Sequence, residues 1–223
     1  MQFSKKALLV AITGPDGSGK SLLCRRMTEL MQSDYSLSVR IASIWDVKDD
    51  LPGLSYGNLQ KCFAALNPVA SSLAIFYALH HCLELAERAS PNIILYDAYW
   101  YKYAVSGLVR GVDYRLMTSL ISTLPVPDCV IYLQTSPATT EMRKQVLSPY
   151  ETNHGNPSLK GKTRFLAAQH QGLRYWQKLQ VDYGPWILID AEQGACEVFD
   201  EALSRTIDLF SPIFANRAAQ ELC

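Results

Sequence analysis

The chain carries no excess of charge of either sign. Its 223 residues include 21 lysines and arginines and 21 aspartates and glutamates, so the formal net charge at pH 7 is zero. A neutral chain exerts no general attraction on nucleic acid or on an anionic membrane surface. We therefore expect neither as a partner, and any anion that the protein binds must be held at a local site.

Cysteine pairs and long apolar runs are also missing. The six cysteines lie far apart, without the C-x-x-C spacing typical of zinc sites or the crowding typical of disulfide-rich secreted domains. The apolar run at residues 7–12 is too short for a signal peptide, and the stretch 69–86 is interrupted by serines, histidines and a glutamate, unlike a membrane span. These features predict a protein of the reducing cytoplasm.

Short aliphatic runs alternate with longer segments of helical period. This alternation is typical of an α/β fold, in which helices cover both faces of a parallel sheet, and the length fits a single domain over residues 1–223. The expected strands are residues 7–13, 38–44, 92–96, 129–133 and 186–190. The expected helices are residues 20–32, 68–89, 99–109, 113–124, 137–144, 163–182 and 195–210.

Two segments between these elements lack a clear period. Residues 46–58 and 146–162 contain prolines, glycines and asparagines, and we predict that both are loops that cover a substrate. The helix at 68–89, in contrast, has apolar residues at spacings of four and three, which predict one buried stripe. The residues of this stripe are Val69, Leu73, Phe76, His80 and Leu83.

The strongest motif is Gly14-Pro-Asp-Gly-Ser-Gly-Lys-Ser21, a complete G-x-x-x-x-G-K-S sequence between an apolar strand and an amphipathic helix. Such a P-loop points successive backbone N–H groups at phosphate oxygens. We predict that Lys20 reaches the β and γ phosphates of ATP and that Ser21 offers its hydroxyl to Mg²⁺. The predicted phosphate-binding residues are Gly14, Asp16, Gly17, Ser18, Gly19, Lys20 and Ser21.

An acid ends the third expected strand, where Asp97 follows the apolar run Ile93-Ile-Leu-Tyr96. In P-loop proteins an acid at this place lies beside the phosphates and holds Mg²⁺ directly or through water. An N-cap for the helix that follows is an alternative role, and the two are compatible. The sequence therefore predicts Asp97 as the second metal-binding residue.

These motifs resemble those of the thymidylate kinases, a family of P-loop nucleoside monophosphate kinases, over nearly the whole chain. The loop 14–21 is similar to the family's D-G-x-G-K-[ST], and Asp97–Ala104 is similar to its D-R-Y-x-x-S-x-x-A segment. The resemblance implies a P-loop fold with a five-stranded parallel sheet, which agrees with the expected strands, and a lid at about residues 145–163. Further similar segments are 107–111, 127–133 with Pro137, 165–175 and 188–191.

The resemblance also implies roles for single residues. Asp16 would face the acceptor sugar, and Phe76, with Tyr77 beside it, would lie near the acceptor base. Gly17 stands where some relatives carry an arginine, so the positive charge for the transition state would come from the lid. The candidates for this charge are Arg143, which falls where the family's lid begins, and Lys160, Lys162 and Arg164.

The acceptor side departs from the family pattern. Ala98 stands where the family has the arginine that binds the acceptor phosphate, and His80 occupies a second arginine position on that side. Ile44-Trp45-Asp46 replaces the family's R-E-P. Lys102, four residues after Ala98, lies on the same face if a helix starts there and is predicted to place an ammonium near the missing guanidinium, the alternative being an ordinary solvated lysine.

We therefore expect an enzyme that transfers a phosphoryl group from ATP, with Mg²⁺, to a small nucleotide such as dTMP. Two alternatives stay open. The lost arginines also suit a kinase for a nucleoside or another small hydroxyl compound, in which Asp97 acts as the base, or an ATP-binding protein without acceptor chemistry. The apolar helix around residues 69–86 further suits a homodimer.

Overall fold

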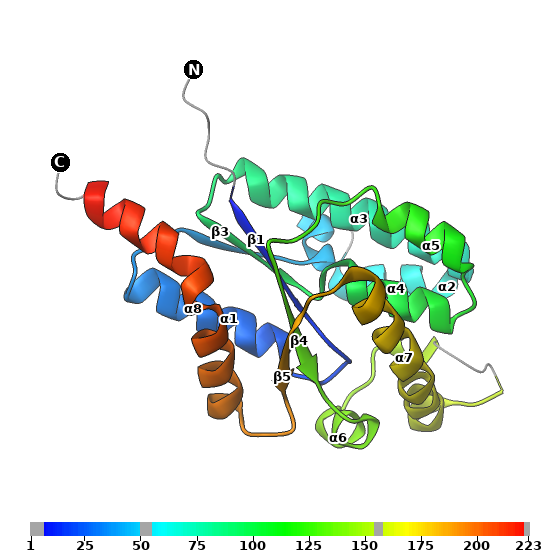
Figure 1. Cartoon of the computed structure of the whole chain (residues 1–223). Helices are drawn as coiled ribbons and strands as arrows, with labels where there is room; N and C mark the ends of the chain where they lie inside the picture. Colours follow the sequence, from blue (N-terminus) through cyan, green and yellow to red (C-terminus); the bar gives the residue numbers. More distant parts are fainter. Residues whose placement is uncertain (1–6, 50–54, 154–157, 221–223) are drawn as a thin grey trace.

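The computed structural model describes residues 7–49, 55–153 and 158–220 (Figure 1). Its centre is a five-stranded parallel sheet with the strand order β2-β3-β1-β4-β5. Helices flank this sheet, so the chain has an α/β fold consistent with a P-loop kinase, and the expected fold class is confirmed. The strands are β1 (Leu8–Thr13), β2 (Val39–Ala42), β3 (Ile93–Asp97), β4 (Cys129–Gln134) and β5 (Ile187–Asp190).

The strands are buried because helices cover both faces of the sheet (Figure 1). Successive side chains of a strand point to opposite faces, and β1 is apolar on both: Val10 and Ile12 pack with α1, whereas Leu9 and Ala11 pack on the side of α3. One face carries α1 (Lys20–Ser33) and α8 (Ala195–Gln220). The other carries α3 (Pro68–Arg88), α4 (Tyr99–Val109) and α7 (Gly161–Tyr183), with α5 (Tyr114–Ile121) beside α4.

The prediction of a loop at residues 46–58 is wrong at both ends of this segment that the structure describes. A 3₁₀ helix, η1 (Ile44–Asp49), follows β2, and a helix that the sequence analysis missed, α2 (Tyr56–Ala65), begins soon after. Ser55 caps α2, because its side chain accepts a hydrogen bond from the backbone N–H of Asn58 at 3.3 Å. Residues 50–54 lie outside the described residues.

The predicted lid also contains regular structure. Helix α6 (Pro137–Arg143) leads into it, a 3₁₀ turn, η2 (Glu151–Asn153), interrupts the expected loop, and α7 begins two residues earlier than predicted, at Gly161. Residues 154–157 lie outside the described residues. The lid therefore approaches the body of the protein through η2, which packs against α7.

Helix α3 turns a different face to the core from the one predicted. Phe76 and Leu83 of the expected stripe are buried, but Val69 is 42% exposed, Leu73 is 49% exposed and His80 is exposed. The helix is apolar or small on several sides, so a period of 3.6 does not select one face. The residues of α3 that are buried are Ser71, Ser72, Ile75, Phe76, Ala78, Leu79, Cys82, Leu83 and Ala86.

Length and composition alone would allow α3 to cross a membrane. However, 50% of its most apolar window is buried inside the fold, and the helix packs against α4, η1 and β2. A core helix of a globular domain passes the same test, so this feature carries little weight as evidence for a membrane span.

Leu79 and Leu73 give a direct test of how α3 is oriented. Leu79 is 0% exposed and Leu73 is 49% exposed. We expect Leu79→Ala to lower the free energy of unfolding by about 2–5 kcal/mol, because it leaves a cavity in the core, and Leu73→Ala to lower it by less than about 1 kcal/mol. Urea unfolding of dilute protein measures both changes. A loss for Leu73→Ala as large as that for Leu79→Ala would contradict this orientation.

Candidate active site

The carboxyl ends of β1 and β3 bring the P-loop and Asp97 together. The two strands are neighbours, and Ile12 lies opposite Asp97 in their register. The loop turns away from β1 at Gly14, whose φ is +144°, and a Cβ atom at this position would lie 2.6 Å from the carbonyl oxygen of Leu133. Glycine is therefore required there. Gly19, with φ of 97°, begins α1, whose first N–H groups are free to meet an anion.

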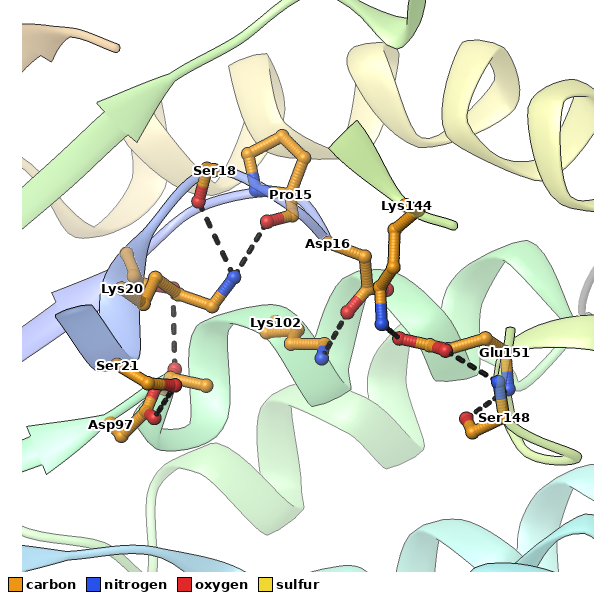
Figure 2. Close-up of polar contacts among 12 residues, drawn as sticks. Pro15, Asp16, Ser18, Lys20, Ser21, Asp97, Lys102, Lys144, Ser148 and Glu151 are labelled. Atoms are coloured by element: carbon orange, nitrogen blue, oxygen red, sulfur yellow. Dashed lines mark hydrogen bonds and ion pairs between the residues drawn. The ribbon is translucent and has the colours of Figure 1, made fainter. Parts of the chain in front are cut away.

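Lys20 folds over the P-loop and is only 7% exposed. Its Nζ atom donates to the carbonyl oxygen of Pro15 at 2.6 Å and contacts Ser18 Oγ at 3.4 Å (Figure 2). Burial, together with the positive charge of Lys102, lowers the pKa of Lys20 to about 8. A bound anion would offset both effects, so this lysine favours a negatively charged ligand.

Ser21 and Asp97 form a link between the start of α1 and the end of β3. Ser21 Oγ donates to Asp97 Oδ2 at 2.5 Å (Figure 2). Within the described part of the chain, no group of three or more histidine, cysteine or acidic side chains is placed to hold a metal. One hydroxyl and one carboxylate fit Mg²⁺, which usually takes few protein ligands and completes its shell with water and phosphate oxygens.

Asp16 and Lys102 form a buried ion pair that joins the P-loop to α4 (Figure 2). Burial raises the pKa of Asp16, but the charges of Lys102 and Lys20 outweigh burial, so this pKa lies far below its usual range. Burial likewise lowers the pKa of Lys102, and Asp16 outweighs it and raises this pKa. Both groups are therefore charged at neutral pH.

A second ion pair comes from the predicted lid. Lys144 pairs with Glu151 of η2, and Glu151 also accepts a hydrogen bond from the backbone N–H of Ser148 at 2.8 Å (Figure 2). Lys144 Cγ lies 3.5 Å from the position that a Cβ atom of Gly17 would take. The chain that leads into the predicted lid therefore packs on the P-loop at Gly17, which has no side chain.

The groups above line one cavity of about 320 Å³. Part of its lining is charged and part is aromatic, and the aromatic part comes from η1, α2, α4 and the lid. The charged residues are Asp16, Lys20, Asp97, Lys102, Lys144 and Glu151, and the residues of the aromatic part are Trp45, Tyr56, Gln60, Tyr103 and Tyr150.

A second cavity, of about 240 Å³, shares Gly17 and Gly19 with the first and extends to the loop after β5 and to α8. Arg143 and Arg26 line it. Arg143 donates from Nη1 to the carbonyl oxygen of Ala191 at 2.7 Å, and Arg26 donates from Nη1 to that of Ala195, also at 2.7 Å. Guanidinium groups that are held in this way can stack on a planar ring.

Several residues predicted from the family resemblance lie away from the 320 Å³ cavity. Phe76 is 3% exposed and belongs to the core between α3 and the sheet. Tyr77 is 56% exposed and stacks on His81, with ring centroids 5.9 Å apart. His80 shares a hydrogen bond of 2.8 Å with Thr123 Oγ1. The structure does not bring these three residues together with the P-loop.

The predicted lid cations are also separated from one another. Arg143 lines the second cavity, whereas Lys160, Lys162 and Arg164 line neither of the two cavities. Lys160 and Lys162 are exposed at the start of α7. Two other residues from this part of the chain reach the charged lining: Lys144, directly before the predicted lid, and Glu151 of η2, neither of which was predicted from the sequence.

The aromatic part of the cavity was missed for a physical reason. Tyr56 and Gln60 lie on α2, and this helix was not predicted. Trp45 lies three residues after the end of β2, at the same edge of the sheet as Asp97, so the rule that parallel strands present ligand-binding residues at their carboxyl ends would have found it. No short motif marks Ser148, Tyr150 or Glu151.

The Asp16–Lys102 ion pair is expected to contribute to the free energy of unfolding. Lys102→Met leaves Asp16 buried without its main partner, and we expect a loss of about 3–5 kcal/mol in the free energy of unfolding at pH 7. Because the native pKa of Asp16 is lowered, this stabilisation is present above the ordinary aspartate pKa and is lost as the pH falls toward the native value. Urea unfolding over a pH series measures the loss, which should shrink in acid.

The control for this prediction is the double variant with Asp16→Asn and Lys102→Met. It removes both charges, so it should recover most of the stability that Lys102→Met loses. If the double variant loses as much as the two single variants added together, the two side chains are not coupled.

Comparison with known proteins finds a distant relative. A protein of Methanococcus aeolicus that is named probable thymidylate kinase is 23% identical to this chain over 130 residues. The match covers 57% of this chain and 61% of the relative, which is less than two thirds of either. No family model matches the chain. Together with the P-loop and the parallel sheet, the distant relationship supports a nucleotide kinase function in these general terms.

Proposed function

We propose that the protein transfers the γ-phosphoryl group of Mg²⁺-bound ATP to a nucleoside monophosphate, with thymidylate as the acceptor. One observation carries this proposal: a single cavity joins the P-loop to a lining of aromatic side chains and one carboxamide. A nucleotide has the same two parts, because it carries phosphate at one end and a planar base at the other. The cavity therefore matches an acceptor that meets the triphosphate end to end.

The donor would lie along the P-loop. The backbone N–H groups of residues 14–21 and the ammonium of Lys20 would bind its β and γ phosphates. Ser21 and Asp97 would hold Mg²⁺, which neutralises phosphate charge when it is bound. The base of the donor would enter the second cavity, where the guanidinium of Arg143 offers a flat surface for stacking.

The acceptor would lie over Asp97 and α4. The carboxylate of Asp16 suits a hydrogen bond from a sugar hydroxyl, and Lys102 would attract the acceptor phosphate, a task that Ala98 cannot perform. The name of the distant relative, probable thymidylate kinase, supports thymidylate as this acceptor.

The positive charge for the transition state would come from Lys144. Its side chain reaches the lining of the cavity and packs over Gly17, whereas Lys160, Lys162 and Arg164 do not line the cavity. Phosphoryl transfer depends mainly on positioning and on charge neutralisation, and a cation carried by a lid also helps to exclude water.

Lys20→Ala tests the donor part of the proposal. The variant removes the ammonium of the P-loop, and we expect it to lower kcat by roughly 100-fold or more, the order of effect of removing one preorganised donor from an active site. Diphosphate formation from thymidylate and ATP measures the change. Lys178→Ala, on the outer side of α7, is the control and should keep full activity. Unchanged turnover in Lys20→Ala would disprove the donor site.

A second candidate is a kinase for an uncharged acceptor such as a nucleoside. It is favoured by the pairing of both Lys102 and Lys144 with carboxylates, so that three ammonium and three carboxylate groups balance in the described lining. A balanced lining does not require a second dianion. In this case Asp97 would accept the proton of the attacking hydroxyl.

Parallel assays with thymidylate and thymidine separate the two candidates. We expect diphosphate from thymidylate and no monophosphate from thymidine, because Lys102 and Lys144 can be shared with a phosphate. Chromatography of the products measures both. Product from thymidine alone would establish the second candidate, and ATP binding without any product would show an ATP-binding protein that lacks acceptor chemistry.

A further inference from the structure

Gln60 is a buried polar residue that lacks a partner within the described part of the chain. It is 9% exposed and shares the buried face of α2 with Leu59 and Phe63. No hydrogen bond to its carboxamide occurs among the described residues, and the side chain lines the 320 Å³ cavity. Thr135 Oγ1 is the one fully buried side-chain nitrogen or oxygen without a partner among the described residues, so the carboxamide of Gln60 is open to the cavity. A molecule in the cavity can therefore hydrogen-bond to it, and such a bond is favourable for an amide that has little contact with water.

Aromatic side chains line the same cavity as this carboxamide. Tyr56 lies one helical turn before Gln60 on α2, so both side chains are on the same face, and both line the cavity together with Trp45 and Tyr103. The ring of Trp45 is held by Tyr56, with centroids 5.0 Å apart, and by Phe63, at 6.0 Å. Rings that are fixed in this way offer flat surfaces to a planar ligand.

We propose that Gln60 reads the base of the acceptor by a pair of hydrogen bonds, an assignment that rests on the nucleotide acceptor proposed above. A carboxamide carries one acceptor and one N–H donor side by side. The edge of thymine or uracil offers the complementary pair, a ring N3–H beside a carbonyl oxygen. Gln60 is thus a specificity-determining residue of the acceptor site, and Trp45 and Tyr56 enclose the base that it binds.

A purely structural role for Gln60 accounts for its position less well than a role in binding the base. Leu59 and Phe63 already anchor α2 in the core, and α2 begins at the Ser55 cap. A leucine of similar size at position 60 would pack on the same face without burying an unpaired amide. The two roles therefore differ in what they predict: a structural glutamine is needed for stability, whereas a base-reading glutamine is needed only for the ligand.

The experiment compares the wild type with Gln60→Leu, using thymidylate and its N3-methyl derivative as probes. Calorimetric titration without triphosphate measures the two affinities for each protein. We expect N3-methylation to weaken binding to the wild type by about ten- to hundredfold, the usual discrimination of one bidentate pair. In Gln60→Leu the same methylation should have little effect, and thymidylate itself should bind about ten- to hundredfold more weakly than to the wild type. Gln177→Leu, an exposed glutamine of α7, is the matched control and should behave as the wild type.

Thermal unfolding completes the test, since Gln60→Leu should be at least as stable as the wild type. The proposal is overturned if N3-methylation weakens binding to Gln60→Leu as much as it weakens binding to the wild type, or if thymidylate does not bind. It is also overturned if the variant is less stable than the wild type while its preference between the two ligands is unchanged. Because the titrations contain no triphosphate, an inactive protein that binds thymidylate through Gln60 would refute the kinase and not this assignment. A protein that phosphorylates a compound without a base would support the kinase activity and refute the role of Gln60.

Discussion

The ion pair between Asp16 and Lys102 is the contact on which the rest of the site depends. The P-loop has no regular structure of its own, and Asp16 lies at its middle, so the pair fixes the loop to α4. Ser21 and Asp97 provide a second link, from the first turn of α1 to the end of β3. One link thus joins the loop after β1 to α4, and the other joins the helix after that loop to the end of β3. Once they are made, the loop can present its N–H groups to an anion in one fixed direction.

The charges of the site are balanced before any ligand enters. Lys102 is paired with Asp16 and Lys144 with Glu151, so neither ammonium lies buried without a counterion. Such pairing is needed because an isolated buried charge is strongly unfavourable. A phosphate that enters must share these ammonium groups with the carboxylates, and the pair in the lid is the easier one to rearrange because Lys144 is more exposed than Lys102. The body of the site and the lid therefore differ in how readily their cations can move.

Local patterns made the P-loop and Asp97 predictable from the sequence. The motif depends on spacing within eight residues, and parallel strands end at one edge of the sheet, so Asp97 had to lie near the loop. The aromatic part of the cavity was not predictable in this way. It requires α2, where Gly57 suggested a break although a glycine is tolerated in the first turn of a capped helix. The places of Phe76 and His80 depend on which face of α3 meets the core, and several faces of α3 are apolar. That orientation places Phe76 in the core and His80 beside Thr123.

The backbone at Ala98 has a consequence for how such a site can evolve. Ala98 adopts φ of 73° at the start of α4, is 3% exposed, and lines the same cavity as Lys102. An arginine introduced at position 98 would put a second cation beside an ammonium that already neutralises Asp16, and like charges repel strongly where water is scarce. The effects of substitutions at positions 98 and 102 are therefore expected to be non-additive, because both residues bear on the charge beside Asp16.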